Sequence, residues 1–365
     1  MLAGAVTKIG FLNDPDESKR GVIGLVDIPE PVPADDEVLI KVGYCSICGS
    51  DPHTADGTFG PNVPLFLGHE VSGVVAGLGK KAVIKGLKIG DRIAGNFRHT
   101  CGVCYFCQMG MPHFCNGTMK LAMAAMEAGE PRKQRPGMAP YLVWNESQVF
   151  KLPDNVSLKQ GCILEPLSIA VRAGDKVANQ VGARICVSGG GPIGQLTLQV
   201  LKAQGGTHLT MIEPIADRRD LAKRFGADFV IDPVNQNTVE EGLRITDGLG
   251  YDVVVDVSGS PHAAPNLPPI TARGGTLMYG AMYPTEYEMP FNLYQYMYRM
   301  DLTLTGLFLS PHTFPRSVQL MPHLDLDPFL QSVYPLEQIK EAFDMHMSGK
   351  YPKVIINCNA DLADA

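Results

Sequence analysis

The sequence predicts an α/β protein of two domains, a β-rich domain followed by one built on a doubly wound parallel sheet. Its 365 residues exceed the roughly 100–200 residues of one ordinary domain. Near residue 165 the pattern changes from short strands between Gly and Pro turns to strands that alternate with helices. We therefore expect a first domain over residues 1–160 and a second over residues 161–305. Residues 306–365 are too few for a useful core of their own, so we expect them to complete one or both of these domains.

Short β-branched or alternating runs predict the strands of the first domain. Turn signals such as Asp56-Gly57 separate these runs from one another. The runs that we expect to form strands cover residues 37–42, 71–76, 91–94 and 148–152.

In the second domain strands and helices alternate, which indicates a parallel sheet with crossover helices. A glycine-rich turn follows the first strand, and Gly226 ends the second helix. The expected strands cover residues 184–187, 208–212, 229–231, 252–257 and 276–279, and the helices 195–204 and 216–225. The C-terminal part adds short strands at 302–304 and 354–356 and a helix at 336–347 that Gly349 caps.

Composition narrows the possible partners. The net charge is −7 and Lys and Arg form no dense run, which excludes a nucleic-acid or anionic-membrane surface. Residues 1–14 lack the pattern of a secretory signal, and no apolar stretch approaches the ~20 residues that span a bilayer. We therefore expect a cytoplasmic protein whose partners are small molecules.

Four of the nine cysteines crowd one segment with the spacing C-x2-C-x2-C-x7-C. They are Cys101, Cys104, Cys107 and Cys115. In a reducing compartment this pattern indicates a metal site rather than disulfides, and Zn²⁺ accepts four thiolates in a tetrahedron. Gly102 and Gly110 ease the turns, and four protein ligands leave no open position, so we expect a structural zinc. An iron–sulfur cluster and four reduced cysteines without metal are the alternatives.

A second group of residues has the composition of a catalytic zinc site, which keeps one position open. Its thiolate, imidazole and carboxylate would come from Cys48, His69 and Glu70. Glu165, in the segment Glu165-Pro166-Leu167 between the two domains, is a further candidate ligand. Each piece alone is also typical of a packing cysteine or a surface turn, and only the combination favours a metal.

The residues around Cys48 suggest how protons would move. Zinc acts as a Lewis acid that lowers the pKa of a bound oxygen, as for water from ~15.7 to ~7. Ser50 and His53 could pass the released proton to solvent. Asp51 could orient a metal ligand, and Cys45 is assigned no role beyond packing.

The segment from Gly189 to Gly194 satisfies G-x-G-x-x-G after a strand and at the start of a helix, the context of a dinucleotide site. Gly189, Gly191 and Gly194 would allow the pyrophosphate to approach the helix N-terminus. Glu213, at the expected distance of about 20 residues, would bind ribose hydroxyls and repel a 2′-phosphate, which favours NAD over NADP. Arg218 and Arg219 could instead bind that phosphate, or could simply be solvated on the next helix.

With these motifs the chain resembles the zinc-containing medium-chain alcohol dehydrogenases, especially the polyol (sorbitol), butanediol and threonine dehydrogenase branch. The resemblance covers essentially the whole chain. It rests on residues 43–53 (GYCSICGSDPH), Gly68-His69-Glu70, the four cysteines, Glu165-Pro166-Leu167 and residues 189–194, with weaker matches at Arg273-Gly274-Gly275 and residues 349–355 (GKYPKVI). It implies a GroES-like catalytic domain built from both ends of the chain, a Rossmann cofactor domain, and a homodimer or homotetramer.

The resemblance also implies roles for single residues. Glu165 would contact the substrate or, in some states, the metal, and Ser50 would carry the relay hydroxyl. The implied ligands of the catalytic zinc are Cys48, His69 and Glu70. The implied cofactor contacts are Ile193, Glu213 and Arg218.

The chain departs from the sorbitol dehydrogenases in three places. Leu309 and Ser310 stand where those enzymes carry an Arg-Tyr pair, and Thr54 stands where animal sorbitol dehydrogenases have an aromatic residue. The loss of an arginine that binds several hydroxyls argues against sorbitol itself. Residues 120–136 read as a longer loop that covers the substrate cleft, lies on the surface or contacts another subunit.

These observations predict a zinc-dependent enzyme that reversibly oxidises a secondary alcohol of a polyol, cyclitol, sugar acid or diol to a ketone with NAD. A threonine-type amino-alcohol dehydrogenase is the nearest alternative. A primary alcohol fits less well, because the branch with His, Cys and Cys around zinc has a Cys where Glu165 stands. A metal-free quinone or enone reductase would not need either metal group. A non-catalytic redox sensor that binds dinucleotide, or a zinc-organised interaction module, would leave the open metal site unexplained.

Overall fold

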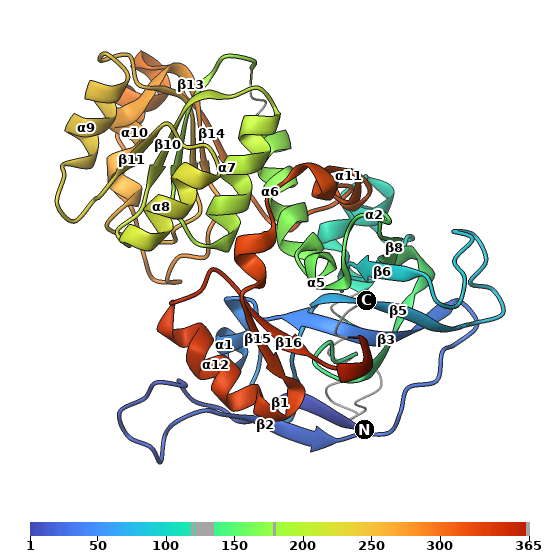
Figure 1. The fold of residues 1–365 in the computed structure, drawn as a ribbon. Coiled ribbons are helices and arrows are strands. Elements are labelled where there is room, and N and C mark those ends of the chain that lie inside the picture. The colour runs from blue at the N-terminus through green and yellow to red at the C-terminus, as the bar shows by residue number, and fades with distance from the viewer. Residues whose placement is uncertain (118–119, 121–134, 178–179, 363–365) are drawn as a thin grey trace. The chain divides into compact units, whose positions relative to one another are not determined.

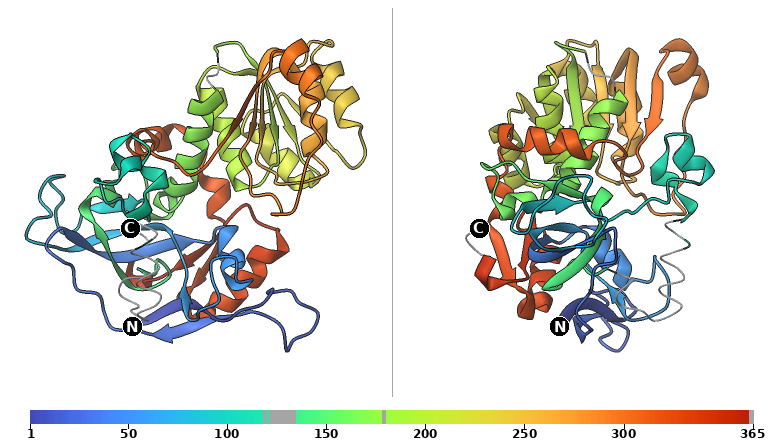
Figure 2. Two further views of the ribbon diagram at one scale, coloured as in Figure 1. Left: turned by 180° about the vertical axis from the view of Figure 1, so that it is seen from behind. Right: turned by 90° about the vertical axis from the view of Figure 1, so that its right-hand side faces the viewer.

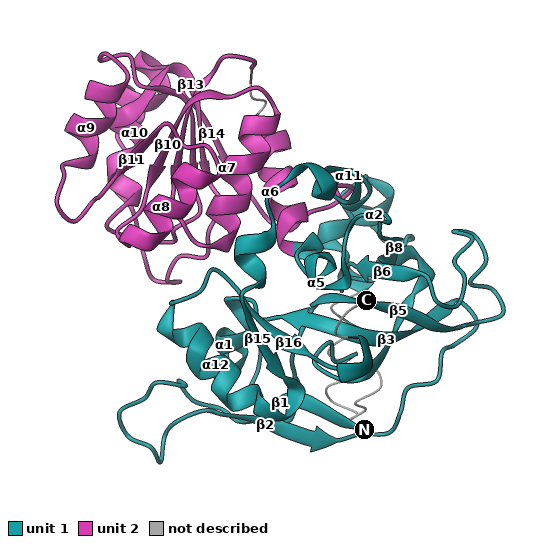
Figure 3. Cartoon of the chain, in the orientation of Figure 1, with its two compact units in different colours: residues 1–165, 314–365 teal, residues 166–313 magenta. Residues whose placement is uncertain are grey.

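The computed structural model describes residues 1–117, 120, 135–177 and 180–362. The expected loop at residues 120–136 lies mostly outside these described residues. The chain forms two compact units, one of residues 1–165 with 314–365 and the other of residues 166–313. Within the described residues no helix has both the length and the hydropathy to cross a membrane. Figure 1 shows the elements, Figure 2 shows two further views, and Figure 3 shows the two units.

The first unit is β-rich, as predicted, and contains two sheets. In the larger sheet the strand order is β15-β16-β3-β5-β6-β8, and β7 also pairs with β3. Its strands are β3 (Glu37–Ser46), β5 (Glu70–Leu78), β6 (Arg92–Gly95), β7 (Tyr141–Asn145), β8 (Val149–Lys151), β15 (Ser332–Pro335) and β16 (Val354–Asn357). The smaller sheet has the order β2-β1-β4, from β1 (Leu2–Lys8), β2 (Val22–Asp27) and β4 (Leu65–Phe66). The four strands expected in this domain are therefore confirmed.

Two long-range pairings of the larger sheet bring distant residues together. β3 pairs antiparallel with β5, with Ser46 opposite Glu70. On its other side β3 pairs antiparallel with β16, with Ser46 opposite Ile355. Alternating Val and Ile side chains of β3 and the buried Trp144 of β7 form the core between these strands. The sheet thus places the segments that precede β5 and β16 on either side of the end of β3.

The helices of the first unit lie in the segments that connect its strands. The expected C-terminal helix begins as a 3-10 turn (Leu336–Gln338) and continues as α12 (Ile339–Ser348). Gly349 ends it with φ of 67°, a left-handed conformation that glycine adopts without strain. The other helices described here are α1 (Ser50–Ala55), α2 (Tyr105–Gln108), α5 (Leu158–Gly161), α6 (Leu164–Val177), which continues into the second unit, and α11 (Phe314–Leu320).

The second unit is the predicted parallel sheet, in the order β11-β10-β9-β12-β13-β14. Helices flank this sheet on both sides (Figure 2). Its strands are β9 (Arg184–Ser188), β10 (Thr207–Ile212), β11 (Phe229–Ile231), β12 (Tyr251–Asp256), β13 (Thr271–Tyr279) and β14 (Thr303–Gly306). Its helices include α7 (Pro192–Ala203), α8 (Ala216–Arg224), α9 (Thr238–Ile245) and α10 (Leu267–Ile270). The strand order reverses between β9 and β12, and a doubly wound sheet binds its ligand at such a point.

Candidate metal centres and cofactor site

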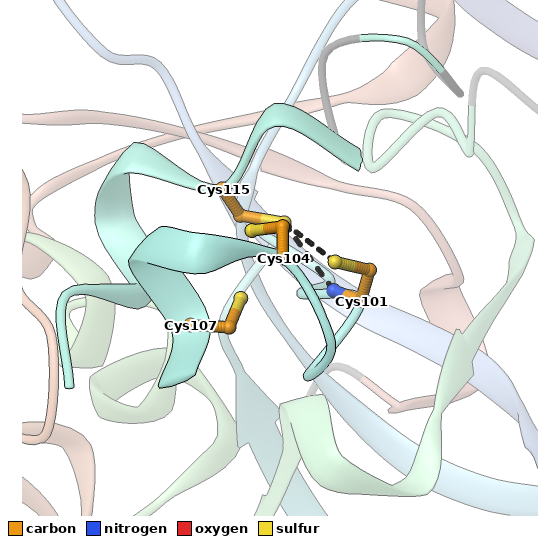
Figure 4. Close-up of side chains that lie close together, drawn as sticks. All are labelled: Cys101, Cys104, Cys107 and Cys115. Atoms are coloured by element: carbon orange, nitrogen blue, oxygen red, sulfur yellow. Dashed lines mark hydrogen bonds between the residues drawn. The ribbon is translucent and has the colours of Figure 1, made fainter. Parts of the chain in front are cut away.

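The four predicted cysteines form one group around α2 and the 3-10 turn at Pro112–Phe114 (Figure 4). Their sulfur atoms all lie within 4.8 Å of one another. Gly102 and Gly110 have φ of 70° and 73°, so the expected turns are confirmed as left-handed turns that favour glycine. All nine cysteines, which the structure describes in full, are free thiols.

This group fits a metal bound by four thiolates. The Cys101 backbone N–H donates to the Cys115 sulfur at 3.3 Å. A hydrogen bond from the Cys107 backbone N–H lowers the pKa of the Cys104 thiol, whereas burial raises the pKa of the Cys107 thiol to about 12. A Cβ on Gly117 would lie only 3.0 Å from the Cys101 sulfur, so only glycine leaves this side of the group open. With no position left for substrate, such a metal would stabilise the fold.

A second group joins Cys48, His69 and Glu70, whose ligand atoms also lie within 4.8 Å of one another. Cys48 follows β3, and His69 precedes Glu70, the first residue of β5. The pairing of Ser46 with Glu70 therefore brings the two segments together. One thiolate, one imidazole and one carboxylate form the donor set of a metal site with an open position, so these residues fit a catalytic zinc.

Asp51 connects the two candidate ligands on either side of it. The Cys48 backbone N–H donates to Asp51 Oδ2 at 2.8 Å, and Asp51 Oδ1 lies 3.7 Å from Nδ1 of His69. The Asp51 side chain is buried, so it has little solvent to screen its charge. These contacts suit the orienting role that the sequence suggested for Asp51.

Lys353 is a member of this site that sequence reasoning missed. Its ammonium donates to Glu70 Oε1 at 2.6 Å, to Glu70 Oε2, and to the backbone oxygen of Ile47 at 3.0 Å. The side chains of Lys353 and Glu70 are 4% and 1% exposed. The Ser46 hydroxyl also donates a hydrogen bond to Glu70 Oε2. The sequence held one signal for this residue, a lysine directly before the apolar run of β16. A lysine buried next to such a strand needs an acidic or polar partner.

Glu165 does not belong to the close group of Cys48, His69 and Glu70, but charges of that group affect its pKa. It sits in the first turn of α6 and is buried. Burial raises the pKa of Glu165 to about 7, although the charge of His69 opposes this and that of Glu70 adds to it. Near neutral pH this carboxyl can therefore hold or release a proton.

The two predicted proton carriers lie on α1. Ser50 is half-buried, and its backbone oxygen accepts a hydrogen bond from the Thr54 hydroxyl at 3.3 Å. The His53 side chain is 49% exposed, and its Nδ1 lies 2.9 Å from Oδ2 of Asp56. Within the described chain no direct hydrogen bond joins Ser50 to His53. His53 is therefore placed where it can exchange protons with solvent.

The glycine turn of the second unit has the form that a dinucleotide site requires. Gly189 follows β9 with φ of 99°, and Gly191 is the N-cap of α7. A Cβ on Gly194 would lie 1.7 Å from the backbone oxygen of Gly189, so no larger residue fits there. Ile193 is half-buried in the first turn of the same helix.

Glu213, directly after β10, is held against this turn. Its Oε2 accepts the Gly190 N–H at 2.7 Å and its Oε1 accepts the Ile215 N–H at 2.9 Å. Arg218 lies 4.0 Å from the same carboxylate. Arg219 is otherwise engaged, because it donates to the backbone oxygens of Glu213 and Pro214 at 2.8 and 2.7 Å and pairs with Asp232 at 3.0 Å. Arg219 therefore holds the loop after β10, and Arg218 is the arginine paired with the Glu213 carboxylate.

Comparison with known proteins agrees with this geometry. Residues 34–154 match the alcohol dehydrogenase GroES-like domain, and residues 192–323 match the zinc-binding dehydrogenase family. L-threonine 3-dehydrogenase of Pyrococcus abyssi is 33% identical over 342 residues, which are 90% of this chain and 93% of the relative. D-arabitol-phosphate dehydrogenase of Enterococcus avium is 31% identical over 93% of this chain and 95% of its own length. A solved Clostridium scindens chain described as a zinc-binding dehydrogenase superposes with a TM-score of 0.86 at 28% identity, covering 98% of this chain and 99% of that one.

Proposed function

The chain belongs to the zinc-containing medium-chain alcohol dehydrogenases, and from this premise we propose that it oxidises a secondary alcohol of a polyol, cyclitol, sugar acid or diol to a ketone with NAD. As a member of this family it is a zinc-dependent NAD(P) dehydrogenase. The observation that carries the proposal is the group of Cys48, His69 and Glu70, three ligands that would leave a tetrahedral zinc one position for a substrate oxygen. The resemblance to the family also supports a homodimer or homotetramer.

Each residue of the first unit would have a distinct task. Zinc, when bound, supplies the Lewis acidity that makes an alcohol hydroxyl acidic near neutral pH. Cys48 and His69 would hold the ion. Glu70 and Glu165 would supply the carboxylate ligands, either both at once or in alternation. Asp51 would orient the first two by the contacts described above. Ser50 would accept the proton of the substrate, and the exposed His53 would pass it to solvent.

The second unit supports NAD rather than NADP as the preferred cofactor. The glycine turn and the N-terminus of α7 would bind the pyrophosphate, with contacts from Gly189, Gly191, Ile193 and Gly194. Glu213 is fixed by two backbone N–H groups, so its carboxylate would meet the ribose hydroxyls and repel a 2′-phosphate. Arg218 would then offset part of the Glu213 charge.

L-threonine is the second candidate substrate. It is favoured by the 33% identity to a threonine dehydrogenase over nearly the whole chain. L-threonine carries a secondary hydroxyl on carbon 3, so the same proton and metal chemistry would apply. An amino-acid substrate would in addition need partners for its carboxylate and ammonium groups.

The test is a screen of NAD⁺ reduction over polyols, inositols, sugar acids, diols and L-threonine, with NADP⁺ controls. Cys48→Ala should abolish turnover on the best substrate and remove one metal ion per chain, while cofactor binding persists. Cys45→Ala is the matched control, because Cys45 lies on β3, three residues before Cys48, and belongs to neither metal group. Near wild-type turnover of Cys48→Ala would overturn the metal assignment, and a preference for NADP⁺ would overturn that of Glu213.

A further inference from the structure

A buried carboxylate ends the central strand β12 of the second unit. Asp256 is fully buried and lies in register with Ser188, the last residue of β9. Its Oδ1 accepts a hydrogen bond from the Ser258 hydroxyl at 2.7 Å, and its Oδ2 accepts one from the Tyr283 hydroxyl. Within the described residues no lysine or arginine pairs with it. Two hydroxyl groups therefore satisfy side-chain oxygens whose burial would otherwise be unfavourable.

These bonds hold two loops to the end of the sheet. Ser258 belongs to the turn after β12, which touches the glycine turn: a Cβ on Gly189 would lie 2.7 Å from the Ser258 backbone nitrogen. Tyr283 belongs to the segment after β13, where the Gly280 N–H also donates to the Asp256 backbone oxygen at 2.8 Å. The Tyr283 ring stacks on Tyr287 with centroids 5.7 Å apart. Asp256 thus joins the glycine turn to residues 280–287.

The direction in which a dinucleotide would lie follows from the sheet. Its pyrophosphate would sit at the N-terminus of α7, outside β9. Its adenosine ribose would lie toward Glu213, which follows β10 on one side of β9. The nicotinamide half must then extend to the other side of β9, over the carboxyl ends of β12 and β13. Asp256 and residues 280–283 lie at those ends.

We propose that Asp256 and Tyr283 form a clamp that positions residues 280–283 against the nicotinamide half of the cofactor. The inference rests on the proposed use of NAD. Both are positioning residues, because Asp256 is fully buried and acts through the hydroxyl groups bound to it. Without the Tyr283 hydroxyl, Asp256 loses one of its two side-chain donors and residues 280–283 lose their side-chain anchor to β12.

The experiment compares the affinities of the holoenzyme for NADH and for ADP-ribose, which lacks nicotinamide, by calorimetry. Tyr283→Phe should weaken NADH about tenfold, a difference of about 1.4 kcal/mol, and ADP-ribose less than about twofold. Tyr251→Phe is the matched control, because it removes another tyrosine hydroxyl bond of the same sheet, to Thr210 at 2.9 Å, away from the clamp. It should leave the ratio of the two affinities unchanged.

Asp256→Asn is the second variant, in case Tyr283→Phe does not fold, and it should shift the ratio in the same direction. If the variants lowered the affinities for NADH and ADP-ribose equally, so that their ratio did not change, the proposed clamp would be overturned. Failure of the wild-type enzyme to bind NADH would instead overturn the proposed function.

Discussion

Replacing Lys353 with methionine should strongly destabilise the β-rich unit. The change removes the cation that contacts both oxygens of Glu70 and leaves that carboxylate buried. Methionine is similar in length and apolar, so little packing is lost with the charge. The perturbation therefore isolates the ion pair at the end of β3.

The expected loss follows from the geometry of this pair. Two unit charges at the 2.6 Å separation of Lys353 and Glu70 attract by about 6 kcal/mol at an effective dielectric constant of about 20. The cost of having buried both charges offsets part of this attraction, and breaking such a pair typically costs about 3–5 kcal/mol. A metal cation beside Glu70 would offset part of its charge, so we expect the lower end, about 3 kcal/mol, in the holoenzyme.

The assay uses the single tryptophan of the chain. Trp144 is 1% exposed in β7 of the same unit, and it pairs with Val38 of β3. Its fluorescence during urea unfolding therefore reports on the sheet that holds the pair. With a slope near 3 kcal/mol per molar urea, Lys353→Met should lower the midpoint by about 1 M.

The double variant Lys353→Met with Glu70→Gln is the control. It removes both charges, and Ser46 can still donate to the amide oxygen, so it should be more stable than Lys353→Met alone. A free energy of unfolding for Lys353→Met within about 0.5 kcal/mol of the wild type, the range of ordinary surface substitutions, would show that the ion pair does not stabilise the sheet.

Two further predictions concern the metal group of four cysteines and the cofactor. Cys107→Ser should lower the metal content measured by elemental analysis by one ion per chain and lower the melting temperature, because a structural metal contributes directly to folding; full metal content would contradict the four-thiolate site. Glu213→Gln should reduce the preference for NAD⁺ over NADP⁺ about tenfold in kcat/KM, because the repulsion of the 2′-phosphate disappears. An unchanged preference, with Glu213→Asp as the charge-conserving comparison, would assign the selectivity to other residues.

The sequence alone was sufficient for the features that depend on neighbouring residues. The four cysteines lie within residues 101–115, so their spacing already predicts one metal group, and the structure brings the sulfurs together. The glycine turn, its helix and Glu213 belong to consecutive elements, and the structure contains the strand, turn and helix that the pattern predicts. Local patterns likewise predicted the β-rich unit, from its short strands between turns, and the parallel sheet, from strands that alternate with helices.

Only the tertiary structure could identify partners that are distant in the chain. Lys353 and Glu70 are separated by 283 positions and meet because β16 and β5 pair with opposite edges of β3. Asp256 and Tyr283 meet because the segments after β12 and β13 fold over the same end of the sheet. Strand order and register are set by the packing of the whole sheet, and hydrophobic periodicity carries no record of which strands become neighbours. A buried charge in the sequence shows that a partner is needed, and the fold decides which residue it is.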